Sequence, residues 1–172
     1  MAVGTVSAVR MDSRFGRAVQ WLAMSPRFGR IAPHFIPQID RFLHRISGGR
    51  IMLNDILMPG VLLTTTGAVS GLPRETPILA IPLDGDLYVV GSNYGAERHP
   101  AWSSNLIKQP MASVSRKHHD HAVIAHLLTA EEKTAVWPQL TAIWAPYNDY
   151  TERSGRDLRV FRLSRLDDGT FE

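Results

Sequence analysis

A loop rich in small residues and hydroxyl groups separates two apolar segments at residues 62 to 77, which read LLTTTGAVSGLPRETP. Gly67 and Gly71 allow a turn in which several backbone N–H groups point at one oxygen anion. Arg74 would add a charged fork that suits phosphate or carboxylate. The loop lacks the lysine of a P-loop and leads into a strand rather than a helix. The pattern indicates either an anion site or a plain hairpin connection with Arg74 at the surface.

A second segment, residues 137 to 150, is rich in aromatic side chains and reads WPQLTAIWAPYNDY. Trp137 and Trp144 lie two helical turns apart, and Tyr147 and Tyr150 are three residues apart and share a face beyond Pro146. Aromatic residues at this spacing usually pack in a core. Tyrosines near a helix end would also suit a wall over a planar ligand, because each ring stacks and its hydroxyl donates a hydrogen bond.

The cluster His118-His119-Asp120-His121 is the remaining sequence that suggests chemistry. We expect it at a hairpin tip, where consecutive side chains point to opposite faces and do not gather around one ion. We therefore predict no metal site. The chain has no cysteine, which excludes disulfides and a cysteine nucleophile. No serine–histidine–acid set or paired-carboxylate motif is visible.

The elements that would position these groups are predicted mainly as strands after residue 60. Alternation and turn signals place strands at 61–66, 76–81, 87–92, 111–116, 122–128 and 158–166. Helical spacing predicts helices at 14–24, 37–46 and 100–107, and the capping box at Thr129 and Glu132 opens a further helix that runs toward residue 143. Many short strands with interposed helices indicate a small antiparallel barrel.

The charge is concentrated in the N-terminal third. Residues 1–50 hold eight arginines and two aspartates, a net of 8 − 2 = +6, while the other 122 residues sum to 11 − 14 = −3. We divide the chain into a basic helical extension (1–50) and a barrel domain (51–172). The arginines of the extension are either simply solvated or in contact with anionic lipid. The sequence contains no known nucleic-acid-binding motif, so we expect no nucleic-acid partner.

No apolar run reaches the roughly 18 residues that span a bilayer, and no signal peptide is recognised. We expect the protein in the cytoplasm. Peripheral contact with the inner face of the cell membrane is a second expectation, which depends on the basic extension.

Three ordered motifs, LLTTTG…SG.PR..P, SNYGAERHPAW..NL and WPQL…Y.DY, make residues 55 to 165 resemble the deazaflavin-dependent nitroreductase family of actinobacteria. The resemblance implies a mainly β (α+β) fold, a split β-barrel of the FMN-binding type with peripheral helices. It implies the cofactor F420, with FMN a less favoured alternative, and hydride transfer to a quinone, an activated alkene or a nitroaromatic. The loop after residue 66 would then hold the phosphate or the tail carboxylates of F420.

The matching positions imply roles for individual residues. Tyr147 and Tyr150 would be catalytic as hydrogen-bond or proton donors, and the acceptor would contact Trp144, Tyr147, Tyr150 and Leu79. The cofactor would be bound by Thr66, Gly67, Ala68, Val69, Ser70, Arg74, Pro77, Gly91, Ser92, Asn93, Tyr94, Gly95, Ala96, Trp102 and Asn105.

One departure concerns the anion loop. Ala68 and Val69 stand where the family commonly has arginine and lysine, and two charge-assisted contacts of about 1.5–3 kcal/mol each are missing there. A non-catalytic barrel that binds a lipid or another hydrophobic ligand is therefore the alternative function. Both a monomer and a homodimer are compatible with the sequence.

Overall fold

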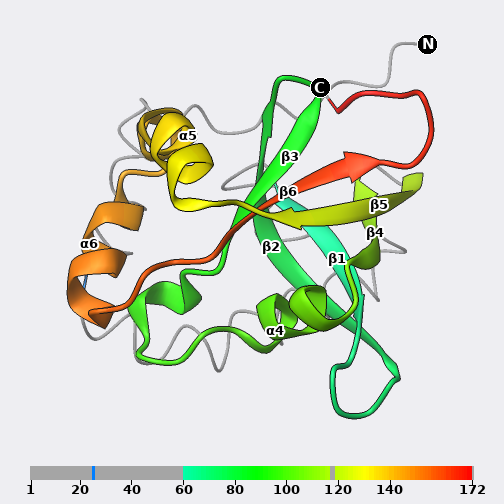
Figure 1. The fold of residues 1–172 in the computed structure, drawn as a ribbon, viewed down its shortest axis with the longest axis horizontal. Helices are drawn as coiled ribbons and strands as arrows, with labels where there is room; N and C mark the ends of the chain where they lie inside the picture. Colours follow the sequence, from blue (N-terminus) through cyan, green and yellow to red (C-terminus); the bar gives the residue numbers. More distant parts are fainter. Residues whose placement is uncertain (1–24, 26–59, 117–118, 172) are drawn as a thin grey trace, which may run out of the picture.

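A six-stranded closed barrel forms the centre of the molecule (Figure 1). The computed structural model describes Ser25 and residues 60–116 and 119–171. The helices predicted at 14–24 and 37–46, and with them the proposed extension 1–50, lie outside these residues. The strands are β1 (Gly60–Thr66), β2 (Pro73–Leu83), β3 (Asp86–Val90), β4 (Met111–Arg116), β5 (His119–Leu127) and β6 (Val160–Arg165).

All neighbouring strands are antiparallel and follow the order β1-β2-β3-β6-β5-β4, with β4 returning to β1. The ring closes through long-range pairs such as Val90 with Val160 and Thr65 with Ala112. The predicted mainly β barrel is therefore confirmed.

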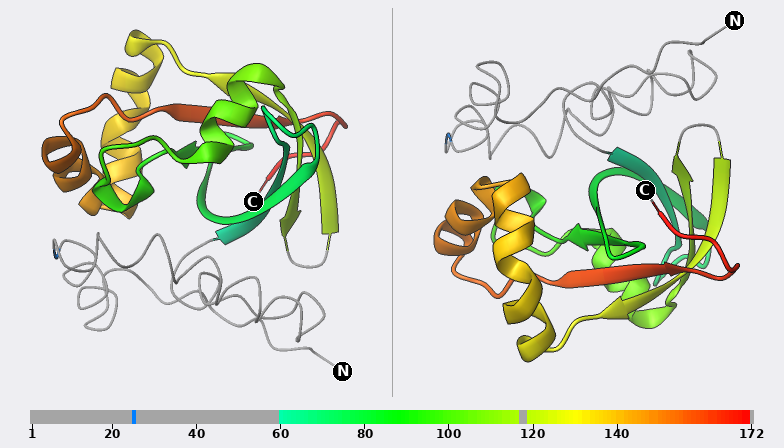
Figure 2. Two further views of the ribbon diagram at one scale, coloured as in Figure 1. Left: turned by 90° about the horizontal axis from the view of Figure 1, so that it is seen from below. Right: turned by 90° about the horizontal axis from the view of Figure 1, so that it is seen from above.

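Three α-helices and one short 3₁₀ turn pack around the barrel in the described part of the chain. They are α4 (Ala101–Lys108), α5 (Ala130–Ile143), α6 (Pro146–Ser154) and η1 (Asn93–Gly95). Figure 2 shows α5 and α6 together at one end of the molecule, away from β4. No helix of the described residues is both long and apolar enough to cross a bilayer.

Strand alternation divides the apolar side chains between two clusters. Along β3, Leu87 and Val89 belong to the cluster inside the barrel, which also includes Trp102 of α4. Tyr88 and Val90 point the other way and belong to a second cluster with α5 and α6. This is the period-two pattern of a strand with both faces covered. The helices that carry the aromatic segment thus pack on the outer face of the barrel.

The predicted elements differ from the observed ones at several places. The strand predicted at 87–92 ends at Val90, because the chain enters η1 through Ser92. The strand predicted to start at 122 begins at His119, so His119 and His121 pair with β4 and do not form a hairpin tip. The capping box is confirmed: Glu132 N–H donates to the Thr129 hydroxyl and Thr129 N–H donates to the Glu132 carboxylate.

Helix α6 is an element that the sequence analysis did not predict. Pro146 occupies its first turn, where a missing N–H group loses no hydrogen bond. Gly155 ends the helix in the left-handed conformation at φ 61°. This pairing of proline at the start and glycine past the end is the signal that identifies the helix.

Candidate active site

Most backbone N–H groups of the loop between β1 and β2, which we call the anion loop, donate hydrogen bonds within the protein. Gly67 N–H donates to the Leu72 carbonyl (2.9 Å) and Gly71 N–H donates to the Gly67 carbonyl (2.8 Å). Leu72 N–H donates to the Ser70 hydroxyl at 3.3 Å. Within the described residues, the N–H groups of Val69 and Ser70 have no such partner. The donors left for an anion are therefore these two at the loop tip.

Helix α4 fixes this loop from one side. The Asn105 side chain accepts from Ala68 N–H at 2.9 Å and donates to the buried Thr65 hydroxyl at 2.9 Å. The Lys108 ammonium donates to the Ala68 carbonyl. Both polar groups of the Ala68 backbone are thus held by α4. Asn105, predicted to bind the cofactor, uses its side-chain amide here to support the loop, and its contact with a cofactor stays a prediction.

Two cations flank the loop tip. The Arg74 guanidinium lies 3.4 Å from the Ser70 hydroxyl and is exposed. Lys108 was not anticipated from the sequence, although a cation in the last turn of a helix is a common arrangement. Thr66 is exposed and the Val69 side chain is completely exposed. The loop thus offers two N–H donors, hydroxyl groups and two cations at one place.

A second loop, residues 91–96, lies at the opposite end of α4. Asn93, Tyr94 and Gly95 follow one another with φ of 47°, 54° and 76°, all in the left-handed region. The Asn93 side-chain amide donates to the Arg98 carbonyl at 2.9 Å and so folds back onto its own loop. Three consecutive left-handed residues, two of them not glycine, are strained. Such strain is frequent at ligand-binding sites.

Helix α4 sets the distance between the two loops. Eight residues at about 1.5 Å each give a length of about 12 Å. Its Trp102 is buried and packs on Phe161 with ring centroids 5.8 Å apart, inside the barrel. Trp102 therefore anchors the helix, while the two loops lie at its two ends.

The aromatic segment forms a buried tyrosine wall, which we define as Trp144, Tyr147 and Tyr150. The rings of Tyr147 and Tyr150 lie 6.5 Å apart in an edge-on contact, and Trp137 lies 6.0 Å from Tyr147. Leu79, on β2, is half-buried and packs against the same cluster. All four residues predicted to contact the acceptor are therefore close together.

Burial raises the pKa of both tyrosines far above the usual range. For Tyr147 the main cause is loss of solvation of the phenolate, with a smaller effect of Tyr150. For Tyr150 burial again comes first, and the charge of Arg153 opposes it. Both hydroxyls therefore keep their protons at neutral pH, and a hydrogen bond with the Trp144 side chain acts on Tyr150 in the opposite direction to burial.

Arg153 joins the tyrosine wall to loop 91–96. Its guanidinium lies 5.2 Å from the Tyr150 ring, and a Cβ atom added to Gly95 would lie 2.8 Å from its Nε. The Nε and Nη2 atoms are buried and have no hydrogen-bond partner in the part of the chain that the structure describes, while Nη1 donates weakly to the Ser25 carbonyl at 3.4 Å. This positive charge lowers the energy of negative charge near Tyr150.

The other residues predicted to bind the cofactor lie in loop 91–96 or, for Pro77, in strand β2. Ser92, Tyr94 and Ala96 are half-buried in the loop at one end of α4. Pro77 is buried in β2 opposite Leu62. Gly91 is buried and its N–H donates to the Arg159 carbonyl at 2.8 Å. Gly91 therefore supports the loop from within.

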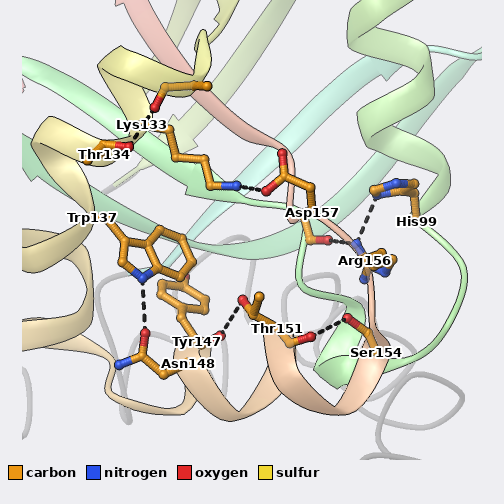
Figure 3. A network of polar contacts seen from close by, with 12 residues as sticks. His99, Lys133, Thr134, Trp137, Tyr147, Asn148, Thr151, Ser154, Arg156 and Asp157 are labelled. Carbon is orange, nitrogen blue, oxygen red and sulfur yellow. Dashed lines mark hydrogen bonds and ion pairs between the residues drawn. The ribbon is translucent and has the colours of Figure 1, made fainter.

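Two further features lie outside this arrangement. Trp137 N–H donates to the Asn148 side chain at 3.0 Å and joins α5 to α6 (Figure 3). An open groove there, of about 500 Å³, does not include the tyrosine wall; it is lined by Lys133, Thr134, Trp137, Pro138, Asn148, Thr151 and Glu152. Among the described residues no group of three or more histidine, cysteine or acidic side chains could hold a metal ion.

Comparison with known proteins identifies relatives of this chain. Residues 39–164 match the family described as F420H(2)-dependent quinone reductase. An F420H(2)-dependent quinone reductase of Mycobacterium tuberculosis is 30% identical over 134 residues, which cover 73% of this chain and 80% of the relative.

Two solved structures agree with this match. One is an F420-H2 dependent reductase (FDR-A) with 32% identity and a TM-score of 0.56, covering 62% of this chain and 94% of the other. A second, described as a domain-swapped dimer, has 30% identity and a TM-score of 0.59, covering 74% and 94%. The barrel is thus the split barrel of such reductases.

Proposed function

Because the chain belongs to the F420H(2)-dependent quinone reductase family, we propose that the two loops and the tyrosine wall carry out that family's reaction. The protein is an F420-dependent oxidoreductase that passes a hydride from the reduced cofactor to a quinone. The alternative, a barrel that only carries a lipid or another hydrophobic ligand, is not favoured by these relatives.

The residues present suit F420 at both ends of α4. The loop tip at Val69 and Ser70, with Arg74 and Lys108, has the donors and charges that phosphate or carboxylate groups require. The loop 91–96 lies beside the tyrosine wall, where Tyr94 influences Tyr150 electrostatically. We assign the anionic part of the cofactor to the first loop and its ring to the second.

The chemistry of the bound cofactor is the donation of two electrons as a hydride. The protein's residues act on the quinone, whose oxygen gains negative charge as the hydride arrives. Tyr147 and Tyr150 donate hydrogen bonds to this oxygen, and Arg153 stabilises the charge from behind Tyr150. Solvent provides the proton that completes the hydroquinone, because burial raises the pKa of both tyrosines and they retain their protons.

The observation that carries this assignment is the contact between α6 and loop 91–96. It brings together the tyrosine wall, the buried Arg153 guanidinium, two of whose nitrogens have no partner among the described residues, and a strained backbone turn. Stacking of the two planar reactants at this place would accelerate hydride transfer by proximity and orientation.

The test is a fluorescence titration of the full chain with F420, with FMN in parallel, followed by mixing with F420H2 and menadione. We expect saturable F420 binding, weaker FMN binding and oxidation of F420H2 that depends on the quinone. Tight FMN binding without F420 binding would overturn the cofactor assignment. Binding of F420 without quinone-dependent oxidation would overturn the reaction.

We also propose peripheral membrane contact through the basic residues 1–50, supported by their net charge of 8 − 2 = +6. Anionic lipid attracts such a segment by about 1 kcal/mol per cation near the surface. The full chain should float with phosphatidylglycerol vesicles but not with phosphatidylcholine vesicles. Replacement of its eight arginines by serine should abolish flotation, and equal flotation of both proteins would refute the proposal.

Reduction of nitroaromatic acceptors is a further proposal, which the resemblance to nitroreductases supports. A planar nitro compound fits the same requirement for stacking against the tyrosine wall and hydrogen bonding to its hydroxyls. Replacing menadione by a nitroaromatic in the F420H2 oxidation assay tests it. Oxidation with menadione alone would restrict the enzyme to quinones.

A further inference from the structure

A single guanidinium organises loop 91–96. Arg156 follows α6, and its Nε and Nη1 donate to the carbonyls of Ala96 and Gly91, both at 3.0 Å. Its Nη2 donates to the Ser92 carbonyl at 2.6 Å. Nη1 also lies 2.9 Å from His99 Nδ1 (Figure 3). Arg156 thus contacts both ends of the loop and His99, three residues beyond it.

These bonds hold the strained turn. Asn93 and Tyr94 are non-glycine residues in the left-handed region, and such conformations persist only where their surroundings fix them. Arg156 binds the carbonyls just before and just after the turn. Arginine suits this role because its planar fork presents several donors in fixed directions.

The bonds also determine which way the loop faces. The carbonyl and N–H groups of one peptide unit point in opposite directions. Since the Ser92 carbonyl points at Arg156, the Asn93 N–H points away from it. This N–H has no partner among the described residues.

The same segment carries the tyrosine wall. Tyr150, Arg153 and Arg156 follow one another at intervals of three residues, and Arg153 lies between Tyr150 and Gly95. The two arginines therefore connect loop 91–96 to the segment that carries Tyr150. Loop 91–96 would face the cofactor ring, and Tyr150 would face the acceptor. The contacts of the two arginines thus connect the two reactant sites.

We propose that Arg156 is a positioning residue for hydride transfer, which sets loop 91–96 at a fixed distance from Tyr150. This inference rests on the proposed function and deepens it. The hydrogen bonds of Arg156 go to backbone carbonyls of the loop and to His99, so its effect would arise through the loop. No carboxylate of the described residues forms an ion pair with it, and its charge is met by carbonyl dipoles.

The test compares Arg156→Ala with Arg159→Ala, a nearby arginine that donates to the hydroxyls of Ser103 and Ser104 on α4. In single turnovers with saturating F420H2 and menadione, Arg156→Ala should slow hydride transfer by about a hundredfold, the effect of a misplacement near 1 Å. Its affinity for F420 should change far less than this rate. Arg159→Ala should leave the rate close to that of the wild type.

A second readout needs no cofactor. Amide hydrogen exchange of residues 92–97 in the ligand-free protein should accelerate in Arg156→Ala and not in Arg159→Ala. Guanidinium ion at millimolar concentration should partly restore both the slow exchange and the transfer rate of Arg156→Ala. A purely structural defect would not respond in this way.

The outcomes separate two failures. If the wild-type protein does not oxidise F420H2 with menadione, the proposed function fails. If the wild type is active and Arg156→Ala reacts at the same rate, or loses rate and affinity equally without rescue, the positioning role is overturned. Should Arg156→Ala not fold, Arg156→Lys tests the positioning role instead. Lysine keeps the positive charge but not the planar set of donors, so hydride transfer should slow in this variant. A wild-type rate would overturn the proposal.

Discussion

At the scale of single residues, the two tyrosines of the wall are held in their neutral form. Tyr147→Phe and Tyr150→Phe should each lower the hydride-transfer rate by about ten- to a hundredfold, the value of one hydrogen bond to a charged group. F420 affinity should be unchanged in both variants. Because burial raises the pKa of both hydroxyls, the wild-type rate should stay flat as the pH passes about 10, the ordinary tyrosine pKa. A fall of the rate there, or full activity of both variants, would contradict this role.

We expect His99 to make the segment from Gly91 to His99 sensitive to acid. Burial lowers the pKa of His99, the charges of Arg159 and Arg156 act in the same direction, and Asp157 opposes them. The imidazole accepts a hydrogen bond from Arg156 at Nδ1 and must be neutral to do so. The unfolded chain binds this proton near pH 6.5, above the folded-state pKa. The stabilising contribution is therefore complete above about pH 6.5 and is lost as the pH falls through the lower folded-state pKa.

The measurement is amide exchange of loop 91–99 between pH 5 and 7.5, corrected for intrinsic exchange rates. The wild-type loop should loosen as the pH falls. His99→Asn, whose amide oxygen is an acceptor that does not titrate, should show no such transition. The same transition in both proteins would assign it to another group.

Val69 is the position at which the anion loop can gain a charge. Its side chain is completely exposed, and the neighbouring Ala68 backbone is fixed by Asn105 and Lys108, so a longer side chain at 69 disturbs no packing. Val69→Lys should tighten F420 binding about three- to tenfold at low salt, and the gain should shrink at high salt. Val69→Gln is the matched neutral control. Equal affinities of the two variants would place the anionic part of F420 elsewhere.

At the scale of elements, Asn105 connects β1, the anion loop and α4. Asn105→Ala removes the donor to the buried Thr65 hydroxyl, which keeps its 3.5 Å contact with the Arg74 carbonyl, and removes the acceptor of the Ala68 N–H. This should destabilise the protein by about 1–3 kcal/mol. It should also weaken F420 binding, because the loop loses its support. Ile107→Ala, on the exposed face of the same helix, should cost under about 0.5 kcal/mol. Urea denaturation measures both changes; equal losses would remove the special role of Asn105.

The sequence predicted those elements whose signals are local. Strand alternation located all six strands, and the capping box at Thr129 fixed the start of α5. The family resemblance predicted that Leu79, Tyr147 and Tyr150 contact the acceptor. Leu79 packs against the cluster that contains both tyrosines, and the contact with an acceptor stays a prediction. Helix α6 was missed because its charged, polar stretch after Tyr150 has no apolar stripe, although Pro146 and Gly155 mark both ends.

The supporting residues could not be predicted because their roles depend on long-range geometry. Arg156 meets carbonyls 60 to 65 positions away in the chain, and Lys108 meets Ala68 from 40 positions away. In the sequence both are ordinary surface cations. The backbone donors of the anion loop were likewise expected to converge on a ligand, whereas most of them are bound within the protein.

At the scale of the whole molecule, the two apolar clusters have different tasks. Leu163 lies in the cluster inside the barrel and Leu140 in the cluster behind the tyrosine wall, and both are fully buried. Leu163→Ala and Leu140→Ala should each destabilise the protein by about 2–5 kcal/mol in denaturant unfolding. Only Leu140→Ala should also change the near-ultraviolet circular dichroism of the tyrosines and slow turnover. Equal effects of both variants on turnover would mean that the clusters act as one.

The closed barrel has a consequence for how the chain is made. Strand β3 pairs with β6, and the partners Val90 and Val160 are separated by 160 − 90 = 70 residues. At a synthesis rate of about 5–20 residues per second, β3 waits roughly 4 to 14 s on the ribosome with one edge unpaired. An exposed edge invites pairing with other chains, so newly made copies are most vulnerable to aggregation during this interval. Yield during expression should therefore depend on chaperones and on temperature more than the stability of the finished barrel suggests.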